Sequence, residues 1–288
     1  MSKFQRDYQI TIETNDGSFV VVQYPLTLEF NIVRNIFASA NTGDFRILNL
    51  GAVTRNRIYK NKFQTNIFRS VVLKAGYDKQ LPIIFNGNIK EAFSYKEQGS
   101  VEFVTEMSCY DGGFDISNSF SSFSLTSGAT EDQVVDRLIK DLKNTERGTI
   151  STIGGEHLRG RTILGNTMDR LSEETGNAAF IDNGKVHVLR DSECLQGDIL
   201  LLNSKTGLLG SPKRTGNLLI VELLFEPKLK VGQQVSLESQ TERNYNGIYK
   251  VIGIQHTGII SGSVNGNCRT IAQLWFGPEP LEVISGRQ

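Results

Sequence analysis

The chain has 288 residues, which is enough for two or three domains of ordinary size. Lysine plus arginine and aspartate plus glutamate both number 31, so the sequence lacks the basic excess of a dedicated nucleic-acid binder. Copies of a chain without net charge do not repel one another, which suits a subunit of an assembly. The longest apolar run, Leu218 to Phe225, is interrupted by Glu222 and is too short to span a bilayer, so we expect a soluble globular protein with no membrane insertion.

Cysteine usage indicates a reducing compartment. The chain contains Cys109, Cys194 and Cys268, none of them in a CxxC pair, and the odd number argues against a disulfide framework. The first seven residues are mostly polar and show no signal peptide. We therefore expect the protein to be made in cytoplasm.

The first part of the chain, residues 1–112, has the alternation of half-buried strands. Residues 8–14 and 101–109 each place alternate apolar side chains on one face. An Asn-Asp-Gly signal at residues 15–17 predicts a hairpin that leads into a second strand from Phe19. Several short strands joined by turns predict a small antiparallel β-barrel.

Three more strands are expected within this part, at Asp44–Leu50, Val71–Tyr77 and Ile83–Ile89. A short helical turn at 54–59 lies between the first two strands. The hydroxyl of Thr54 is expected to cap this turn, because it can accept a hydrogen bond from an N–H group two or three residues on.

The middle part of the chain, residues 113–195, changes character. Residues 117–127 are rich in serine and are expected to form a loop. Thr130 and Gln133 match a capping box, in which each side chain bonds to the main-chain N–H of the other residue. Apolar residues follow at helical spacing, so an amphipathic helix is predicted over 131–142.

Two further elements are predicted in the middle part. A short helix starts after Asn166 and stops at Gly176, since glycine readily takes the left-handed conformation that ends a helix. Residues 180–189 form a hairpin around an Asn183-Gly184 turn. The mixture of helices and strands predicts an α/β domain.

The last part of the chain, residues 196–288, returns to strands. No sequence repeat links it to the first part. The predicted fold class is mainly β, with two antiparallel β-barrels at 1–112 and 196–288 flanking a middle α/β domain at 113–195. The strands predicted in the last part are Leu218–Phe225, Gln233–Glu238, Gly247–His256 and Cys268–Trp275.

Residues that could carry chemistry are scattered along the chain. His157, His187 and His256 fall in three separate predicted elements without the spacing of metal ligands. Cys109 matches no catalytic signature and is expected to be a small buried hydrophobe. The adjacent Glu173 and Glu174 point apart on a helix and cannot share one substrate bond. We therefore expect no catalytic residue, no metal site and no cofactor.

Residues 207–214 look faintly like a phosphate-binding loop. Pro212 removes an N–H group that such a loop needs, and a strand follows where a helix would be required. The segment is better interpreted as a connection into the last domain. Two readings of Leu208 and Leu209 stay open: they are exposed and pack against another subunit, or they fold back onto their own core.

Short motifs in a fixed order carry a family resemblance. The first are LNL at 48–50, TRNRI at 54–58, AGY at 75–77 and IFNGNI at 84–89. Together with later segments, this order resembles that of the baseplate hub proteins of contractile-tailed phages. Related hub domains occur in the spikes of type VI secretion systems. The later segments are 158–167, 182–184, 207–212, 223–232 and 246–251, followed by His256.

The resemblance implies a structural virion protein and not an enzyme. Hubs of this family are homotrimeric rings with two related barrels per subunit, located in the baseplate of the virion tail. Such a ring adapts a sixfold tail tube to a threefold central spike and leaves a channel for DNA. Its expected partners are the tail tube protein, the central spike protein and baseplate wedge proteins. Two alternatives are a tail-associated cell-wall hydrolase and a monomeric carbohydrate- or nucleic-acid-binding β-module.

Overall fold

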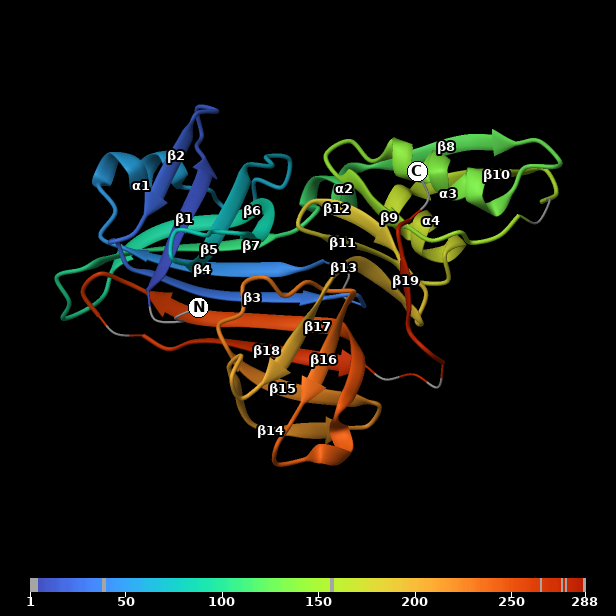
Figure 1. The fold of residues 1–288 in the computed structure, drawn as a ribbon. Helices are drawn as coiled ribbons and strands as arrows, with labels where there is room; N and C mark the ends of the chain where they lie inside the picture. The colour runs from blue at the N-terminus through green and yellow to red at the C-terminus, as the bar shows by residue number, and fades with distance from the viewer. Residues whose placement is uncertain are drawn as a thin grey trace.

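The fold is that of a computed structural model, which describes residues 5–37, 40–155, 158–264, 266–275, 277 and 279–286. Strands take up 52% of the residues that the structure describes and helices 13%, so the predicted mainly β class is confirmed. One mixed sheet of 14 strands dominates these residues, and a smaller group of helices and strands lies beside one end of it (Figure 1). None of the described helices is long and apolar enough to cross a membrane.

The first part of the chain forms one half of the large sheet, and its neighbouring strands are antiparallel. Its elements are β1 (Arg6–Glu13), β2 (Phe19–Gln23), β3 (Leu28–Asn35), β4 (Thr42–Leu48), α1 (Ala52–Ile58), β5 (Ser70–Tyr77), β6 (Ile83–Lys96) and β7 (Phe103–Tyr110). The hairpin predicted at residues 15–17 joins β1 to β2.

The middle part of the chain forms a separate α/β unit with two small sheets of its own. Its elements are α2 (Gly113–Asn118), β8 (Phe120–Leu125), α3 (Glu131–Asp141), β9 (Glu146–Ile150), β10 (Arg161–Asn166), α4 (Thr167–Glu174), β11 (Ala179–Asp182) and β12 (Lys185–Val188). Strands β8 and β10 pair with each other, and β12 lies between β11 and β9.

The last part of the chain forms the other half of the large sheet. Its elements are β13 (Glu193–Asn203), β14 (Leu208–Thr215), β15 (Leu218–Leu224), β16 (Gln233–Glu238), the 3₁₀ helix η1 (Arg243–Tyr245), β17 (Gly247–Ile260), β18 (Cys268–Trp275) and β19 (Glu282–Ile284). Three of the strands predicted here, β15, β17 and β18, are neighbours in the large sheet, and β16 pairs with β17.

The two halves of the large sheet meet where β3 pairs with β17. This pairing, which we call the seam, is antiparallel and runs from Leu28 opposite Ile260 to Asn35 opposite Gly253. The strand order is β14-β15-β18-β17-β3-β4-β7-β6-β5-β1-β2, with β16 attached to β17 and β13 to β16. Among the described residues, strand pairing closes neither half into a barrel, so the two-barrel arrangement stays a prediction.

Buried side chains form three clusters, each drawn mainly from one part of the chain. The first core surrounds Ile32 and Phe85 in the first half of the sheet. The second core surrounds Val221 and Val251 in the other half. The middle core packs the apolar face of α3 and Leu171 of α4 against the small β9–β12 sheet. Burial of these apolar faces is the main stabilising contribution to each unit.

Several local signals in the middle part are confirmed. Thr130 and Gln133 form both bonds of the capping box at the start of α3. The side chain of Asn166 caps α4 by accepting from two main-chain N–H groups, and Gly176 beyond the helix is left-handed, with φ +62°. The Asn183-Gly184 turn joins β11 to β12.

Other expectations are wrong in detail. Helix α1 begins after Gly51, so Thr54 lies inside the helix and caps nothing. The serine-rich segment 117–127 is no loop, because it contains strand β8. Its Ser121 hydroxyl is buried between Asp141, at 2.7 Å, and Thr167, at 2.9 Å. Partners distant in the sequence therefore form the hydrogen bonds that water would form with this hydroxyl in an exposed loop.

Gly112 marks the passage from the sheet to the middle part. It is left-handed, with φ +65°, and a Cβ atom there would lie 2.5 Å from Cδ1 of Ile181. We predict that Gly112→Ala lowers the free energy of unfolding by roughly 2–3 kcal/mol, combining left-handed strain with overpacking. Denaturant unfolding measures this quantity.

Gly176→Ala is the matched control for Gly112→Ala. Gly176 has nearly the same φ, +62°, but nothing lies within 4 Å of its added Cβ. Its cost should therefore be only the strain of the left-handed conformation, roughly 1 kcal/mol. Equal costs at the two glycines would show that the contact with Ile181 contributes nothing.

Candidate functional site

The large sheet has one buried face and one open face. Ile32 of the first core lies opposite His256 across the seam, and His256 lies opposite Thr270 of β18. All three are fully buried. Cross-strand partners share a face, so both cores pack on the same side of the sheet. The next residues along each strand, such as Val33 and Gln255, point to the other side, which we call the open face.

The open face extends over β7, β4, β3, β17, β18 and β15, and the long strands among them lie side by side in Figure 1. Most of its side chains are half-buried or exposed, and most are polar. Carboxylates outnumber cations on it. The charged residues that the strand registers place there are Glu29, Asp44, Glu106 and Glu222 on the acidic side, and Arg46, Lys250 and Arg269 on the basic side.

Most charges of the open face are paired within it. The guanidinium of Arg46 bonds to the carboxylates of Glu29 at 2.8 Å and Glu106 at 3.0 Å, and also to Glu97 at 2.8 Å. Arg269 pairs with Glu222 on the neighbouring strand. The hydroxyl of Tyr95 donates to Glu106, and this hydrogen bond raises the pKa of the tyrosine. Because its cations are paired, the face offers few positive groups to an anion.

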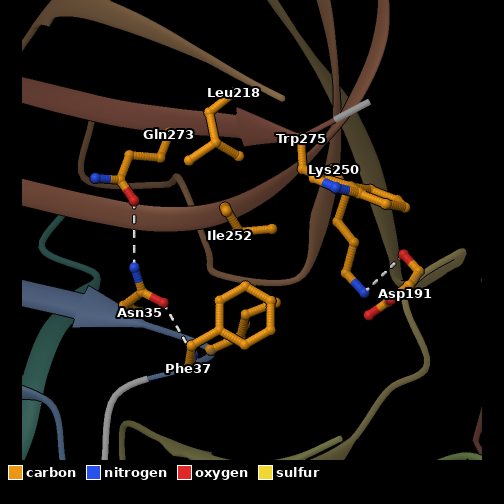
Figure 2. A pocket seen from close by; sticks show the side chains of 9 residues that line it. Asn35, Phe37, Asp191, Leu218, Lys250, Ile252, Gln273 and Trp275 are labelled. Carbon is orange, nitrogen blue, oxygen red and sulfur yellow. Dashed lines mark hydrogen bonds between the residues drawn. The ribbon is translucent and has the colours of Figure 1, made fainter. Parts of the chain in front are cut away.

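A hollow of about 430 Å³ lies at one end of the open face (Figure 2). Phe37 and Trp275 line it, together with the hydrogen-bonded amides of Asn35 and Gln273. Lys250 lies beneath, with its amine bound to the main-chain oxygens of Arg190 at 2.7 Å and Asp191 at 3.2 Å. Burial lowers the pKa of this amine. Its hydrogen bonds give it a structural role at the edge of the hollow.

Leu208 and Leu209 lie side by side on β14, where the sequence indicated a connecting loop. A strand forms because left-handed Gly210, with φ +64°, and a register shift between Leu209 and Lys213 accommodate Pro212. Leu208 is 9% exposed and belongs to the second core. Leu209 is half-buried opposite Glu222, on the open face. A role for either leucine at a subunit interface stays a prediction.

The described histidines and cysteines are enclosed by the fold. His256 lies well inside β17 and not at its end, and His187 is 8% exposed on β12. Burial lowers the pKa of His187 to about 4, and its Nδ1 accepts from the N–H of Thr149. Cys109 is 3% exposed, and burial raises the pKa of its thiol. His157 lies outside the described residues.

Acidic residues are paired with arginines or dispersed. Glu173 bonds to Arg170, and Glu174 bonds to Arg161. Among the residues that the structure describes, no group of three or more histidine, cysteine, aspartate or glutamate side chains is placed to hold a metal ion.

A buried polar cluster was missed in the sequence. Arg34 is 2% exposed and donates to the main-chain oxygen of Leu229 at 3.0 Å and to Nε2 of His256 at 3.3 Å. Its other terminal nitrogen lies 3.4 Å from both carboxylate oxygens of Asp182. An arginine at an inward position, in phase with Ile32, was the available signal. We call Arg34, Asp182, His256 and their neighbours the junction, since they join β3, β11 and β17.

Solved structures with a similar fold come from phage tails and secretion machines. A tail protein from Neisseria meningitidis MC58 has a TM-score of 0.63 at 12% identity, covering 94% of this chain and 96% of its own. A 43 kDa tail protein of prophage MuSo2 from Shewanella oneidensis has a TM-score of 0.60 at 9% identity, covering 93% and 98%. These identities show a shared fold alone.

A third similar structure is an Escherichia coli component of the type VI secretion system, which resembles the T4 tail proteins gp27 and gp5. Its TM-score is 0.59 at 8% identity, and the match covers 90% of this chain and 76% of that one. A search of curated protein sequences finds no match. The family described as baseplate hub gp41, by contrast, matches residues 8–257. Because this match spans most of the sequence, the chain belongs to the baseplate hub gp41 family.

Proposed function

We propose that this protein is the central structural ring of a phage baseplate, formed by three copies that join a sixfold tail tube to a threefold spike. Family membership supports a structural role in a phage tail. The tube protein, the spike protein and baseplate wedge proteins are the partners in this proposal, and DNA passes through the ring. The observation that carries it is a repeat in the order of the strands.

The large sheet contains the same four-strand pattern twice. One half reads β6-β7-β4-β3 and the other reads β17-β18-β15-β14. In each half, the hairpin that comes later in the sequence (β6–β7 or β17–β18) lies beside the earlier hairpin (β3–β4 or β14–β15), and the four strands follow one another in the same order. Strands β6 and β17 correspond in a further way, since both have 14 residues and pair near their start with an additional strand, β5 or β16. This repeat supports treating 1–112 and 196–288 as related domains on either side of 113–195.

The two copies of the pattern are arranged head to tail. The seam joins β3, the last strand of one pattern, to β17, the first strand of the next. Repeating this contact between subunits places β14 of one copy against β6 of the following copy. Three copies then supply six equivalent units, which is the symmetry that a sixfold tube requires.

The two strands that would meet are available for pairing. β14 has β15 as its only strand partner among the described residues. The later part of β6 pairs with β7, and on its other side the described residues supply one isolated bridge, between Lys60 and Ala92. Such edges present unpaired main-chain groups to another chain. An interface of this kind needs at least about 1,000 Å² of buried surface to be stable.

In this ring the open face lines the channel, because the opposite face is covered by the two cores. Its excess of carboxylates and its paired arginines suit the passage of DNA. Phosphates bind to unpaired cations, and a lining without them lets the duplex slide. The same chemistry disfavours specific nucleic-acid binding by this face.

Cysteine cross-linking in assembled tails tests the proposed contact. By analogy with the seam, Thr215 of one copy lies near Lys90 of the next, and both residues are exposed. The double variant Thr215→Cys, Lys90→Cys should give covalent products up to a trimer on mild oxidation. The native cysteines should not interfere, because all three are buried.

The control for this experiment pairs Thr215→Cys with Lys96→Cys. Lys96 lies at the other end of the later part of β6, roughly 20 Å from Lys90 at the rise of a strand. This pair should not cross-link. Equal products from both pairs, or a ladder that continues beyond three copies, would contradict the head-to-tail ring.

Charge reversal on the open face tests the channel. Asp44 is exposed on this face, and its carboxylate accepts from the hydroxyl of Ser108. Particles with Asp44→Lys should eject DNA severalfold more slowly at low salt, because each copy then offers a free cation to phosphate, and high salt should remove the delay. Asp44→Asn should behave like the native protein. Unchanged ejection in the lysine variant at low salt would place the open face away from DNA.

A further inference from the structure

The turn of the β11–β12 hairpin anchors the middle part of the chain to the large sheet. The side chain of Asn41 donates to the main-chain oxygen of Ile181 at 2.8 Å. The N–H of Gly184 donates to Oδ1 of Asp111 at 2.9 Å, and Asn86 donates to the main-chain oxygen of Asn183 at 3.3 Å. In Figure 1 this hairpin lies beside the ends of β4 and β7. Docking of the middle part thus depends on a few polar contacts around one turn.

The charges at this turn do not balance. Asp111 and Asp182 are carboxylates, exposed by only 1% and 7%, and Arg34 is the cation that faces them. His256 adds no charge, because its Nε2 accepts from the guanidinium of Arg34 and therefore carries no proton. Burial lowers the pKa of His256 further. Two ionised carboxylates would leave a net negative charge in the interior, which is costly.

Other titratable groups near the turn do not correct this imbalance. On β12, the amine of Lys185 is 3.4 Å from the carboxylate of Glu146 and its side chain is exposed. His187, also on β12, is neutral at physiological pH because burial lowers its pKa to about 4, although the charge of Asp182 acts in the opposite direction. The positive charge of Lys230 also lowers the pKa of His187, but Lys230 forms none of the hydrogen bonds of the turn named above.

Protonation of Asp111 would remove this excess of negative charge. Its Oδ1 accepts from the N–H of Gly184, and its Oδ2 is buried without a hydrogen bond of ordinary geometry among the described residues. The Oδ1 atom of Asn183, in the same turn, is likewise a buried acceptor without a described donor. Burial and then the charge of Asp182 raise the pKa of Asp111 to about 7. The main-chain N–H groups of Gly184 and Asn183 and the charge of Arg34 favour the ionised form, but they do not outweigh burial and the charge of Asp182. Asp182 pairs with Arg34 at 3.4 Å and accepts from the side chain of Asn41 at 3.3 Å.

We propose that Asp111 carries a proton in the folded protein up to neutral pH, and that this proton is a latch that holds the middle part on the sheet. The neutral carboxyl supplies a donor that the turn lacks and removes the repulsion from Asp182. Ionisation restores that repulsion and weakens the docking of the hairpin. The latch belongs to the single chain and does not depend on ring formation.

The direction of the pH effect follows from linkage. The unfolded chain releases this proton near pH 4, the ordinary value for aspartate, whereas the folded chain keeps it to about pH 7. Between these values the folded state binds more protons at this group, so the contribution of Asp111 to the free energy of unfolding falls as pH rises and then levels off. The latch is therefore tight in mild acid and loose above neutral pH.

Thermal unfolding of the full chain between pH 5 and pH 9 tests the latch. His187 and His256 contribute in the opposite direction, because burial lowers their pKa, and Asp111→Asn keeps both. Relative to Asp111→Asn, the native protein should therefore lose roughly 5 °C or more of its midpoint between pH 5 and pH 8. Asp111→Asn should be the more stable protein at pH 8, because asparagine has the same shape, no charge, and an amide that can donate. A variant with the native pH dependence, or one less stable than the native protein at every pH, would overturn the proposal.

Asp115→Asn is the matched control. Asp115 is fully buried in α2, but its carboxylate accepts from the N–H groups of Lys143 at 2.8 Å and Asn144 at 2.9 Å, and from Ser119. This carboxylate has the donors that an ionised group needs. Its replacement should lower the midpoint at every pH and leave the pH-dependent loss of the native protein in place. Abolition of that loss by Asp115→Asn would also overturn the proposal.

A titration of Asp111 in the native chain tests the proposal without relying on any variant to fold. Carbon-13 NMR of the Asp111 carboxyl in the native chain should show a transition near pH 7, and a transition below pH 5 would overturn the latch. Amide exchange of Gly184 provides the local readout. Compared at equal pH, its exchange should be faster in the native chain than in Asp111→Asn above pH 7, and similar in the two proteins at pH 5. Equal exchange above pH 7 would contradict the proposal.

Discussion

Main-chain pairing between β3 and β17, two strands more than 200 residues apart in sequence, makes one sheet out of two halves. Strand pairing of this kind uses backbone groups, so it requires no particular side chains along its length. What it does require is that both strands bury the same face. The alternation in β3 meets this condition, with Phe30 and Ile32 turned inward and Asn31 and Val33 turned outward. The continuity of the sheet, its single open face and the relation of its two cores all depend on this pairing.

The pairing also brings charged groups into the interior. Arg34 continues the inward phase of β3, so the geometry of the strand places a guanidinium beneath the seam. A buried cation needs partners, and these come from β11, from β17 and from the loop before β16. One arginine thereby links the sheet to the middle part of the chain. The excess of carboxylates over cations around it is what distinguishes Asp111 from the other acidic residues that the structure describes.

Much of the secondary structure could be predicted from local patterns. The Thr130–Gln133 capping box, the Asn183-Gly184 turn and the strand of residues 8–14 depend on residues close in sequence, and the structure contains all three. Wrong expectations arose where distant partners decide the outcome. Ser121 lies in a strand because Asp141 and Thr167 satisfy its hydroxyl.

The candidate sites were harder to predict than the elements. Alternation shows which residues share a face of one strand, but it does not show which strand lies next to which. The sequence therefore did not show that these residues together form one open face. Arg34 resembles an ordinary surface arginine until Asp182, 148 residues later, is placed beside it. The repeat of four strands is equally hidden, because backbone pairing conserves the strand order without conserving side chains. The family resemblance, carried by short motifs in order, indicated the class of protein before these contacts were known.

In the proposed ring, the strand pattern continues from one subunit to the next. A density map of the tail tip, at a resolution that traces strands, would show whether β14 and β6 of neighbouring subunits pair. We expect three copies of this chain around the axis, with β14 of each copy beside β6 of the next and the open face toward the channel. Six copies, a single copy, or three copies whose β14 strands face solvent would contradict this arrangement.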